Sequence, residues 1–416
     1  MLTATGTAPE RAVVTGLGIV APNGLGSADY WAATLRGQSG IARLSRFDPS
    51  SYPTTLGGEI SGFATRGTVP GRLVPQTDRW THFGLYATEL ALTDAGVDPA
   101  ELDEYDMAVV TASSSGGTEF GQREIQALWS HGPDHVGAYQ SIAWFYAATT
   151  GQISIRHGMR GPCGVLAAEQ AGGLDALAHA RRLLGDGPRL VVSGGTDASL
   201  CPYGLVAQQA GGRLSPVTDP ARAYLPFDRD ATGYVPGEGG AIMIVEAHTA
   251  AAARGARIYG EVAGHAATFD PGPRSGRPPA LRRAVELALR DAAIPAEAVD
   301  VVFADGAGVP ELDRVEAEAI EAVFGPYGVP VTVPKTLTGR LYAGGGSLDA
   351  ATALLCLRDG VIPPTAGVDR IAADYRLDLV TGAPRTAPVR TALVLARGYG
   401  GFNSALVLRA PGSTTD

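Results

Sequence analysis

The chain of 416 residues contains two copies of one stretch, and this duplication limits its possible folds more than any other feature. Residues 90–95 read LALTDA and residues 287–292 read LALRDA, and each copy ends a pattern with apolar residues on one helical face. Each copy continues through a Pro-containing turn into an apolar strand, at residues 107–112 and 299–304, and then into a Gly-rich loop. Matching parts in the same order indicate two related halves.

Strand patterns alternate with helical patterns along both halves, which is typical of α/β proteins. We expect the halves to divide near residues 250–260, into domains 1–255 and 256–416, and to pack sheet against helix against sheet. Helices are predicted over residues 171–184 and 348–357. The remaining strands are predicted over residues 11–20, 189–193, 241–246, 257–263, 391–396 and 404–408.

Charge and hydropathy exclude several classes of function. The net charge is −9, from 33 basic and 42 acidic residues, and no long basic run is present, so we expect no nucleic-acid partner. No apolar run approaches the roughly 18 residues that a membrane span requires, and residues 1–10 lack the pattern of a signal peptide. We therefore expect a soluble, cytoplasmic protein that does not contact a membrane.

Two patterns bear on metal ions and cofactors, and neither supports a site. The three cysteines, Cys163, Cys201 and Cys356, are widely spaced and form no zinc pair or disulfide framework, which fits a reducing compartment. Residues 16–21 nominally match a dinucleotide fingerprint, but residues 22–24 read PNG, which favours a turn where that fingerprint requires a helix. We expect no metal and no cofactor.

The most specific motif is residues 161–176, which read GPCGVLAAEQAGGLDA. This segment resembles the nucleophile elbow of ketosynthases, the beta-ketoacyl synthase family, where a strand turns sharply into a buried helix. A cysteine at such a turn gains from the helix N-terminus, which favours its thiolate. Gln170 stands where the family carries that cysteine, and an amide excludes acyl transfer through this position. Cys163, seven residues earlier, is more simply a small buried apolar residue than a substitute nucleophile.

Further segments extend the resemblance over nearly the whole chain. The family's central block is matched by PFDRDATG and GEGG at residues 226–233 and 237–240, and its C-terminal glycine loop by GYGGFN at residues 398–403. The family's two histidine segments are matched by VPKTLTGR at residues 333–340 and ADGAG at residues 304–308. The resemblance implies a thiolase-like five-layered αβαβα fold made of two duplicated halves.

The two histidine segments have both lost their histidine. Lys335 matches the family lysine, but Arg340 and Asp305 stand in the histidine positions, and no histidine follows His265 to replace them. Because arginine cannot shuttle protons near neutral pH, we expect Asp305 and Arg340 to form a structural ion pair rather than a catalytic pair. All three positions of the family's Cys-His-His site are therefore silenced.

Residues 165–176 and 333–340 resemble one branch of the family in particular. This is the chain length factor, or ketosynthase beta subunit, of the minimal type II polyketide synthases that make aromatic polyketide antibiotics in bacteria. The resemblance implies a heterodimer with an active ketosynthase alpha subunit, which together form an acyltransferase complex. A phosphopantetheinyl acyl carrier protein then delivers malonyl groups and the polyketide chain through that partner. The resemblance leaves open whether this chain is itself an enzyme.

In that branch the growing chain extends into a tunnel at the subunit interface, where exclusion of water protects a reactive polyketone. Thr118, Gly121 and Ile125 share one helical face, and the resemblance makes them gate positions together with Ile142 and Tyr203. Small residues at positions 118 and 121 imply room for a long, decaketide-like chain. Ordinary helix packing fits the same spacing equally well.

Two other functions stay open at this point. Ketosynthase-like domains with glutamine at the nucleophile position also decarboxylate malonyl-carrier protein to make starter units. Those domains retain two histidines for the developing enolate, which Asp305 would instead repel. A non-catalytic scaffold that only stabilises the ketosynthase fits the sequence as well as a length-setting subunit does.

Overall fold

The computed structural model describes residues 10–272 and 274–412. In the first half, the strands lie in the order β1, β8, β7, β5, β6, with β8 antiparallel to both neighbours and β5 parallel to both neighbours. The bounds of these strands, and of the short β2 that pairs with β1, are β1 Ala12–Ala21, β2 Gly24–Leu25, β5 Met107–Ala112, β6 Cys163–Leu166, β7 Leu190–Asp197 and β8 Gly239–Ala247.

The second half repeats this topology with the strand order β9, β16, β15, β10, β11, and adds β13 at the edge. Here β16 is antiparallel to both neighbours and β10 is parallel to both neighbours, as β8 and β5 are in the first half. The strands are β9 Gly260–Phe269, β10 Val301–Phe303, β11 Pro330–Thr332, β13 Asp378–Leu379, β15 Thr391–Arg397 and β16 Phe402–Arg409. The predicted duplication is confirmed.

The two sheets meet where β1 and β9 pair, through Val13 with Glu261 and Val14 with Gly260. This short contact joins the strands of the two halves given above into one 12-stranded sheet. The domain boundary predicted at residue 255 falls just before β9, in the connection that leads to this contact. It stays a prediction, because the sheets are continuous there.

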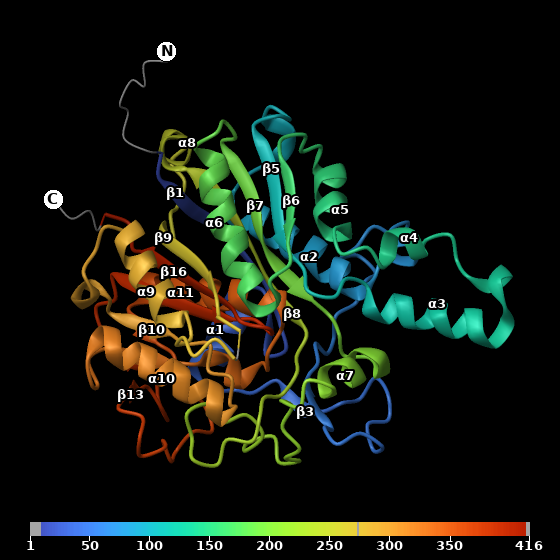
Figure 1. Cartoon of the computed structure of the whole chain (residues 1–416). Coiled ribbons are helices and arrows are strands. Elements are labelled where there is room, and N and C mark those ends of the chain that lie inside the picture. Colours follow the sequence, from blue (N-terminus) through green and yellow to red (C-terminus); the bar gives the residue numbers. More distant parts are fainter. Residues whose placement is uncertain (1–9, 273, 413–416) are drawn as a thin grey trace.

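Helices fill the space between the sheets and cover both outer faces (Figure 1). α6 and α11 pack against each other and against both sheets, α2 and α5 cover the first sheet, and α9 and α10 cover the second. This is the expected five-layered αβαβα arrangement. These helices are α2 Arg79–Ala95, α5 Ala148–His157, α6 Gly172–Leu184, α9 Leu281–Asp291, α10 Pro310–Phe324 and α11 Ala343–Asp359.

Shorter elements lie at the ends of the sheets and on an arm formed by α3 and α4, which extends away from both sheets in Figure 1. No helix in the described ranges is long and apolar enough to cross a membrane. The shorter helices and strands are α1 Ser27–Leu35, α3 Thr118–His131, α4 Gln140–Ala143, α7 Pro202–Gln209, α8 His248–Ala253, β3 Ile41–Arg43, β4 Leu56–Gly58, β12 Val361–Ile362 and β14 Arg385–Thr386.

The repeated LALTDA and LALRDA sequences have the same structural role in each half. The aspartate of each copy accepts a backbone N–H from the first strand of its sheet: Asp94 Oδ2 from Leu17 at 2.9 Å, and Asp291 Oδ2 from His265 at 2.9 Å. Both acceptor contacts lie beside an irregularity in strand register. Each carboxylate therefore ties the last turn of its helix to the first strand of its sheet, and gives a backbone N–H of that strand an acceptor.

Glycines precede both of these N–H groups, and they explain the pattern that resembled a dinucleotide fingerprint. A Cβ on Gly16 would overlap the carbonyl oxygen of Ala91, and a Cβ on Gly264 would overlap that of Ala288 in the other half. Gly18 is likewise pressed against the carbonyl of Ala87. The glycines therefore let the first strand of each sheet approach its covering helix closely.

Candidate functional site

Gln170 lies at the turn between β6 and α6, where the sequence predicted the elbow. Its side chain is completely buried, and within the described residues neither Oε1 nor Nε2 has a hydrogen-bond partner. Gly345 in the first turn of α11 makes room for it, because a Cβ there would collide with the Gln170 amide. Glu169 precedes it with φ of 49°, in the left-handed region that costs free energy for a residue other than glycine. The elbow geometry is present without a nucleophile.

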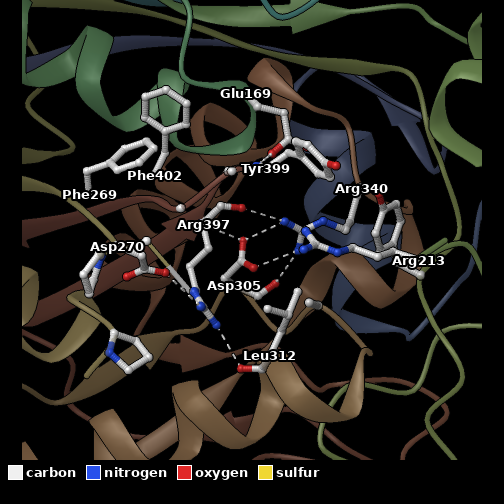
Figure 2. A pocket seen from close by; sticks show the side chains of 18 of the residues that line it. Glu169, Arg213, Phe269, Asp270, Asp305, Leu312, Arg340, Arg397, Tyr399 and Phe402 are labelled. Atoms are coloured by element: carbon white, nitrogen blue, oxygen red, sulfur yellow. Dashed lines mark hydrogen bonds and ion pairs between the residues drawn. The ribbon is translucent and has the colours of Figure 1, made fainter. Parts of the chain in front are cut away.

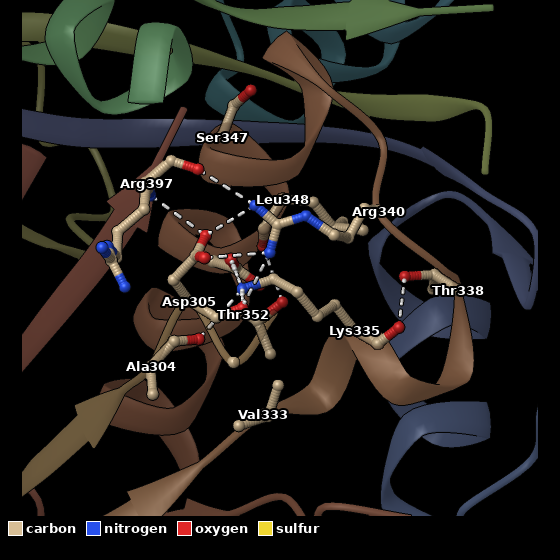
Figure 3. A network of polar contacts seen from close by, with 12 residues as sticks. Ala304, Asp305, Val333, Lys335, Thr338, Arg340, Ser347, Leu348, Thr352 and Arg397 are labelled. Atoms are coloured by element: carbon tan, nitrogen blue, oxygen red, sulfur yellow. Dashed lines mark hydrogen bonds and ion pairs between the residues drawn. The ribbon is translucent and has the colours of Figure 1, made fainter. Parts of the chain in front are cut away.

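Asp305 and Arg340 form the predicted ion pair, which is confirmed as a two-pronged contact (Figure 3). Arg340 donates from Nη1 to Asp305 Oδ2 at 2.9 Å and from Nη2 to Oδ1 at 3.1 Å. The backbone of Arg397 completes the arrangement, since its N–H donates to Asp305 Oδ1 at 3.0 Å and its carbonyl accepts from Arg340 at 3.0 Å. Burial alone would raise the pKa of Asp305, but the charges of Arg340 and Lys335 outweigh it and hold the pKa below its ordinary value.

Lys335, the residue that matches the family lysine, is buried beneath this pair. Its Nζ donates to the carbonyls of Ala304 at 2.9 Å and Asp305 at 3.0 Å, and it lies 2.7 Å from Asp349 Oδ2 (Figure 3). Burial raises the pKa of Asp349 to about 6, although the positive charge of Lys335 opposes that rise. Lys335 therefore connects the loop after β10 to helix α11. Because all three contacts are within the protein, we assign Lys335 a structural role.

A cavity of about 500 Å³ opens beside the ion pair (Figure 2). Asp305 and Arg340 line it, whereas Gln170 does not. Of the described residues that line it, none is Cys, Ser, Thr, His or Lys, so the wall offers no thiol, aliphatic hydroxyl or amine nucleophile and no imidazole base. The other polar and aromatic residues of the wall include Glu169, Arg213, Tyr234, Phe269, Asp270, Arg277, Arg397, Tyr399 and Phe402.

The sequence did not single out several of these residues, and Glu169 is the most informative. Its carboxylate accepts the backbone N–H of Tyr399, and burial raises its pKa, although the charge of Arg340 opposes that rise. Its position directly before Gln170 was the signal available in the sequence. No group of three His, Cys, Asp or Glu side chains within residues 10–272 and 274–412 is arranged to hold a metal ion.

The predicted gate residues lie on or beside the arm. Thr118 and Gly121 are buried on α3, whereas Ile125, Ile142 and Tyr203 are exposed. α3 and α7 are held together where Gln122 accepts the backbone N–H of Tyr203 at 2.7 Å. Their role as one gate stays a prediction.

The room expected above Gly121 is occupied in this chain. A Cβ on Gly121 would lie 2.8 Å from Cδ1 and 3.2 Å from Nε1 of the Trp144 indole. The small residue therefore gives space to a side chain from the end of α4. A prediction from α3 alone missed this contact because Trp144 is distant in sequence.

Cys163 is exposed, so the prediction that it is a buried apolar residue was wrong. It begins β6, which ends the sheet order and pairs with β5 on one side only. A groove of about 410 Å³ runs beside this strand edge, with Ile142, Phe145, Ile155 and Val165 in its lining. Further exposed apolar residues lie on the arm and α7, namely Ile125, Leu128, Trp129, Trp144, Tyr203 and Val206.

Comparisons with known proteins agree with this geometry. Residues 9–251 match the beta-ketoacyl synthase N-terminal domain, and residues 259–369 match the beta-ketoacyl synthase C-terminal domain. The chain is 60% identical over 408 residues to the tetracenomycin polyketide synthase ketoacyl synthase beta subunit of Streptomyces glaucescens, covering 98% of this chain and 100% of the relative.

Two solved structures are similar over the whole fold. The ishigamide ketosynthase/chain length factor has a TM-score of 0.90 at 25% identity, over 97% of this chain and 100% of the other. A chain of the AntDE:AntF complex has a TM-score of 0.87 at 26% identity, again over 97% and 100%. That complex is described as a type II PKS acyl-carrier protein with its ketosynthase bound to the hexaketide.

Proposed function

The chain belongs to the beta-ketoacyl synthase family, and we propose that within it the protein is a chain length factor, the silent ketosynthase subunit of a type II aromatic polyketide synthase. The observation that carries the proposal is the altered site. Gln170 is buried without a nucleophilic atom, and Asp305 and Arg340 neutralise each other where the family resemblance places histidines. A subunit with this site contributes to condensation by enclosing the growing polyketide chain, and not by forming bonds itself.

The free edge of β6 supports an active ketosynthase as the partner. An unpaired strand edge with apolar neighbours is costly to leave in water, and a subunit of the same fold presents a matching edge. Ile155 beside this edge is 73% exposed, which is unusual for a large aliphatic side chain unless another surface covers it. The solved ketosynthase/chain length factor supports the same pairing.

We place the complex in the cytoplasm, with malonyl groups and the polyketide delivered by a phosphopantetheinyl acyl carrier protein through the ketosynthase partner. The described complex of an acyl-carrier protein with its ketosynthase supports that route. On this chain, Thr118, Gly121, Ile125, Ile142 and Tyr203 form the gate of the interface tunnel. Their place on the arm and α7, beside exposed apolar residues, supports enclosure of the chain away from water at the subunit interface. The long, decaketide-like length is proposed from the small side chains at positions 118 and 121 alone, and Trp144 occupies the space over Gly121.

Co-expression with the ketosynthase and acyl carrier protein, followed by mass measurement of products, tests the proposal. Thr118→Phe should shorten the product, because a bulky ring would fill the tunnel at its gate. Thr386→Phe, an exposed threonine in β14, is the matched control and should leave the product unchanged. Gel filtration establishes that each variant still forms the heterodimer. An unchanged chain length in the Thr118→Phe heterodimer would favour the scaffold alternative.

The decarboxylase alternative lacks support in the site. At the two histidine positions an enolate formed from malonyl would meet Asp305, which repels it, and Arg340, whose charge Asp305 already neutralises. The isolated chain mixed with malonyl-carrier protein should therefore yield no acetyl-carrier protein above a no-protein control. Measurement of the carrier protein's mass detects either product, and an acetyl yield that is abolished in a folded Asp305→Asn/Arg340→Met chain would establish the decarboxylase.

A further inference from the structure

Trp144 covers the position that the gate hypothesis treats as open. Its indole lies over Gly121, where an added Cβ would be 2.8 Å from Cδ1, yet the whole residue is still 55% exposed. One side of the ring therefore packs on α3 and the other is free. Among the hydrogen bonds of the described residues, none uses the indole Nε1.

The backbone that carries Trp144 is fixed against the start of α3 by two other glycines. The Gly117 N–H donates to the Trp144 carbonyl at 3.3 Å, and a Cβ on Gly117 would overlap the carbonyl of Ala143. Gly116, with φ of 67°, is pressed in the same way against the Trp144 carbonyl. Three small positions, Gly116, Gly117 and Gly121, thus form a seat for the segment that ends α4.

We propose that the Trp144 indole limits the depth of the polyketide tunnel, and that Gly121 serves as its seat rather than as empty space. This inference rests on the proposed function, because it assigns a specificity residue to the same gate. A large flat apolar ring held by its backbone gives a fixed wall, since two side-chain torsions are all that can move. Its free N–H can also donate to carbonyls of a poly-β-ketone.

The proposal predicts that Trp144→Ala lengthens the product of the reconstituted synthase by at least one two-carbon unit. The double variant Gly121→Phe/Trp144→Ala supplies an aromatic ring from α3 in place of the one from α4. It should return the product toward the length made by the unaltered chain. Trp144→Phe keeps a ring in the seat and should change the length least.

Thr118→Phe in the same assay separates this inference from the proposed function. If Thr118→Phe shortens the product while Trp144→Ala leaves it unchanged, the gate exists and the role of Trp144 is wrong. If neither variant changes the length, the length-setting function itself is wrong. Where Trp144→Ala fails to form the heterodimer in gel filtration, Trp144→Leu replaces it, since leucine keeps an apolar contact but leaves the outer part of the space open. An unchanged length with Trp144→Leu would overturn the proposal.

Discussion

The Arg340 guanidinium meets the Asp305 carboxylate through two hydrogen bonds, of 2.9 and 3.1 Å, and both side chains are buried. The family resemblance places a histidine at each of these two positions. A histidine pair can exchange protons with a substrate, whereas this pair holds opposite charges that satisfy each other. The site has therefore become a structural cross-link between the loop after β10 and the segment before α11.

Arg340→Met should destabilise the chain strongly, because it leaves the Asp305 carboxylate buried without its cation. Removal of one partner from a buried pair costs about 3–5 kcal/mol, and urea unfolding measures the loss. Asp305→Asn/Arg340→Met removes both charges and should recover more than half of that loss. Equal destabilisation of the single and double variants would show that the packing of Arg340, not its charge, stabilises the fold.

Gln170→Leu should leave the free energy of unfolding unchanged or raise it. The amide has no hydrogen-bond partner to lose, and a buried unpaired polar group costs roughly 1–3 kcal/mol. Asn403→Leu is the contrasting control, because the buried Asn403 amide donates to Asp270 at 2.8 Å, and its loss should destabilise the chain. Product formation by the Gln170→Leu heterodimer should be unchanged. A synthase that folds but makes no polyketide would give Gln170 a chemical role.

The sequence predicted the parts of this protein that depend on local pattern. The elbow around Gln170, the Asp305–Arg340 pair and the duplicated units follow from motifs, so they were found. The start of α11 was predicted five residues late, at 348 instead of Ala343, because three consecutive glycines disfavour a helix. Those glycines are required for close packing, as Gly345 against Gln170 shows. That reason is visible only once distant segments meet.

The gate residues show the same limit of prediction from sequence, because their contacts come from distant segments. Helical spacing on α3 placed Thr118 and Gly121 on one face, and both are buried there. The ring over Gly121 comes from Trp144, which lies beyond a turn whose path the residue pattern does not specify. Similarly, the exposure of Cys163 follows from β6 being an edge strand, a property of sheet order rather than of local sequence.

Asp197→Asn should reduce the pH dependence of stability. Asp197 is fully buried at the end of β7, its Oδ2 accepts backbone N–H groups of Ser114 at 3.2 Å and Ala343 at 3.3 Å, and burial raises its pKa to about 7. The folded chain therefore binds this proton more tightly than the unfolded chain, whose carboxyl has its ordinary pKa of 3.8. The stabilisation is complete below pH 3.8 and is lost as pH rises through about 7.

Asparagine can accept the same two hydrogen bonds without a charge, so Asp197→Asn should be the more stable form at about pH 8, by on the order of 2 kcal/mol. Urea unfolding across the range from about pH 5 to pH 8 measures the difference. Some pH dependence should remain, because burial also raises the pKa of Glu316 and Asp313 to about 7. Asp186→Asn, on an exposed turn, is the control and should keep the original slope.

Cys163 should report directly on the partner surface. In the isolated chain its thiol is exposed at the start of β6, whereas Cys201 and Cys356 are buried. A thiol reagent should therefore label Cys163 in native buffer, and should label the other two only after denaturation. When the ketosynthase pairs with the β6 edge, the labelling rate of Cys163 should fall by at least about tenfold, because the thiol then reacts only through transient opening.

Thr386→Cys in a Cys163→Ala background places a thiol on β14, and this thiol should react equally fast in the free chain and in the complex. Gel filtration of the Cys163→Ala chain with its partner checks that the cysteine is not itself needed for assembly. If Cys163 stays as reactive in the assembled complex as in the free chain, the β6 edge is not covered and the partner binds elsewhere. Protection of Cys163 with unchanged reactivity on β14 would instead locate the ketosynthase on this edge of the sheet.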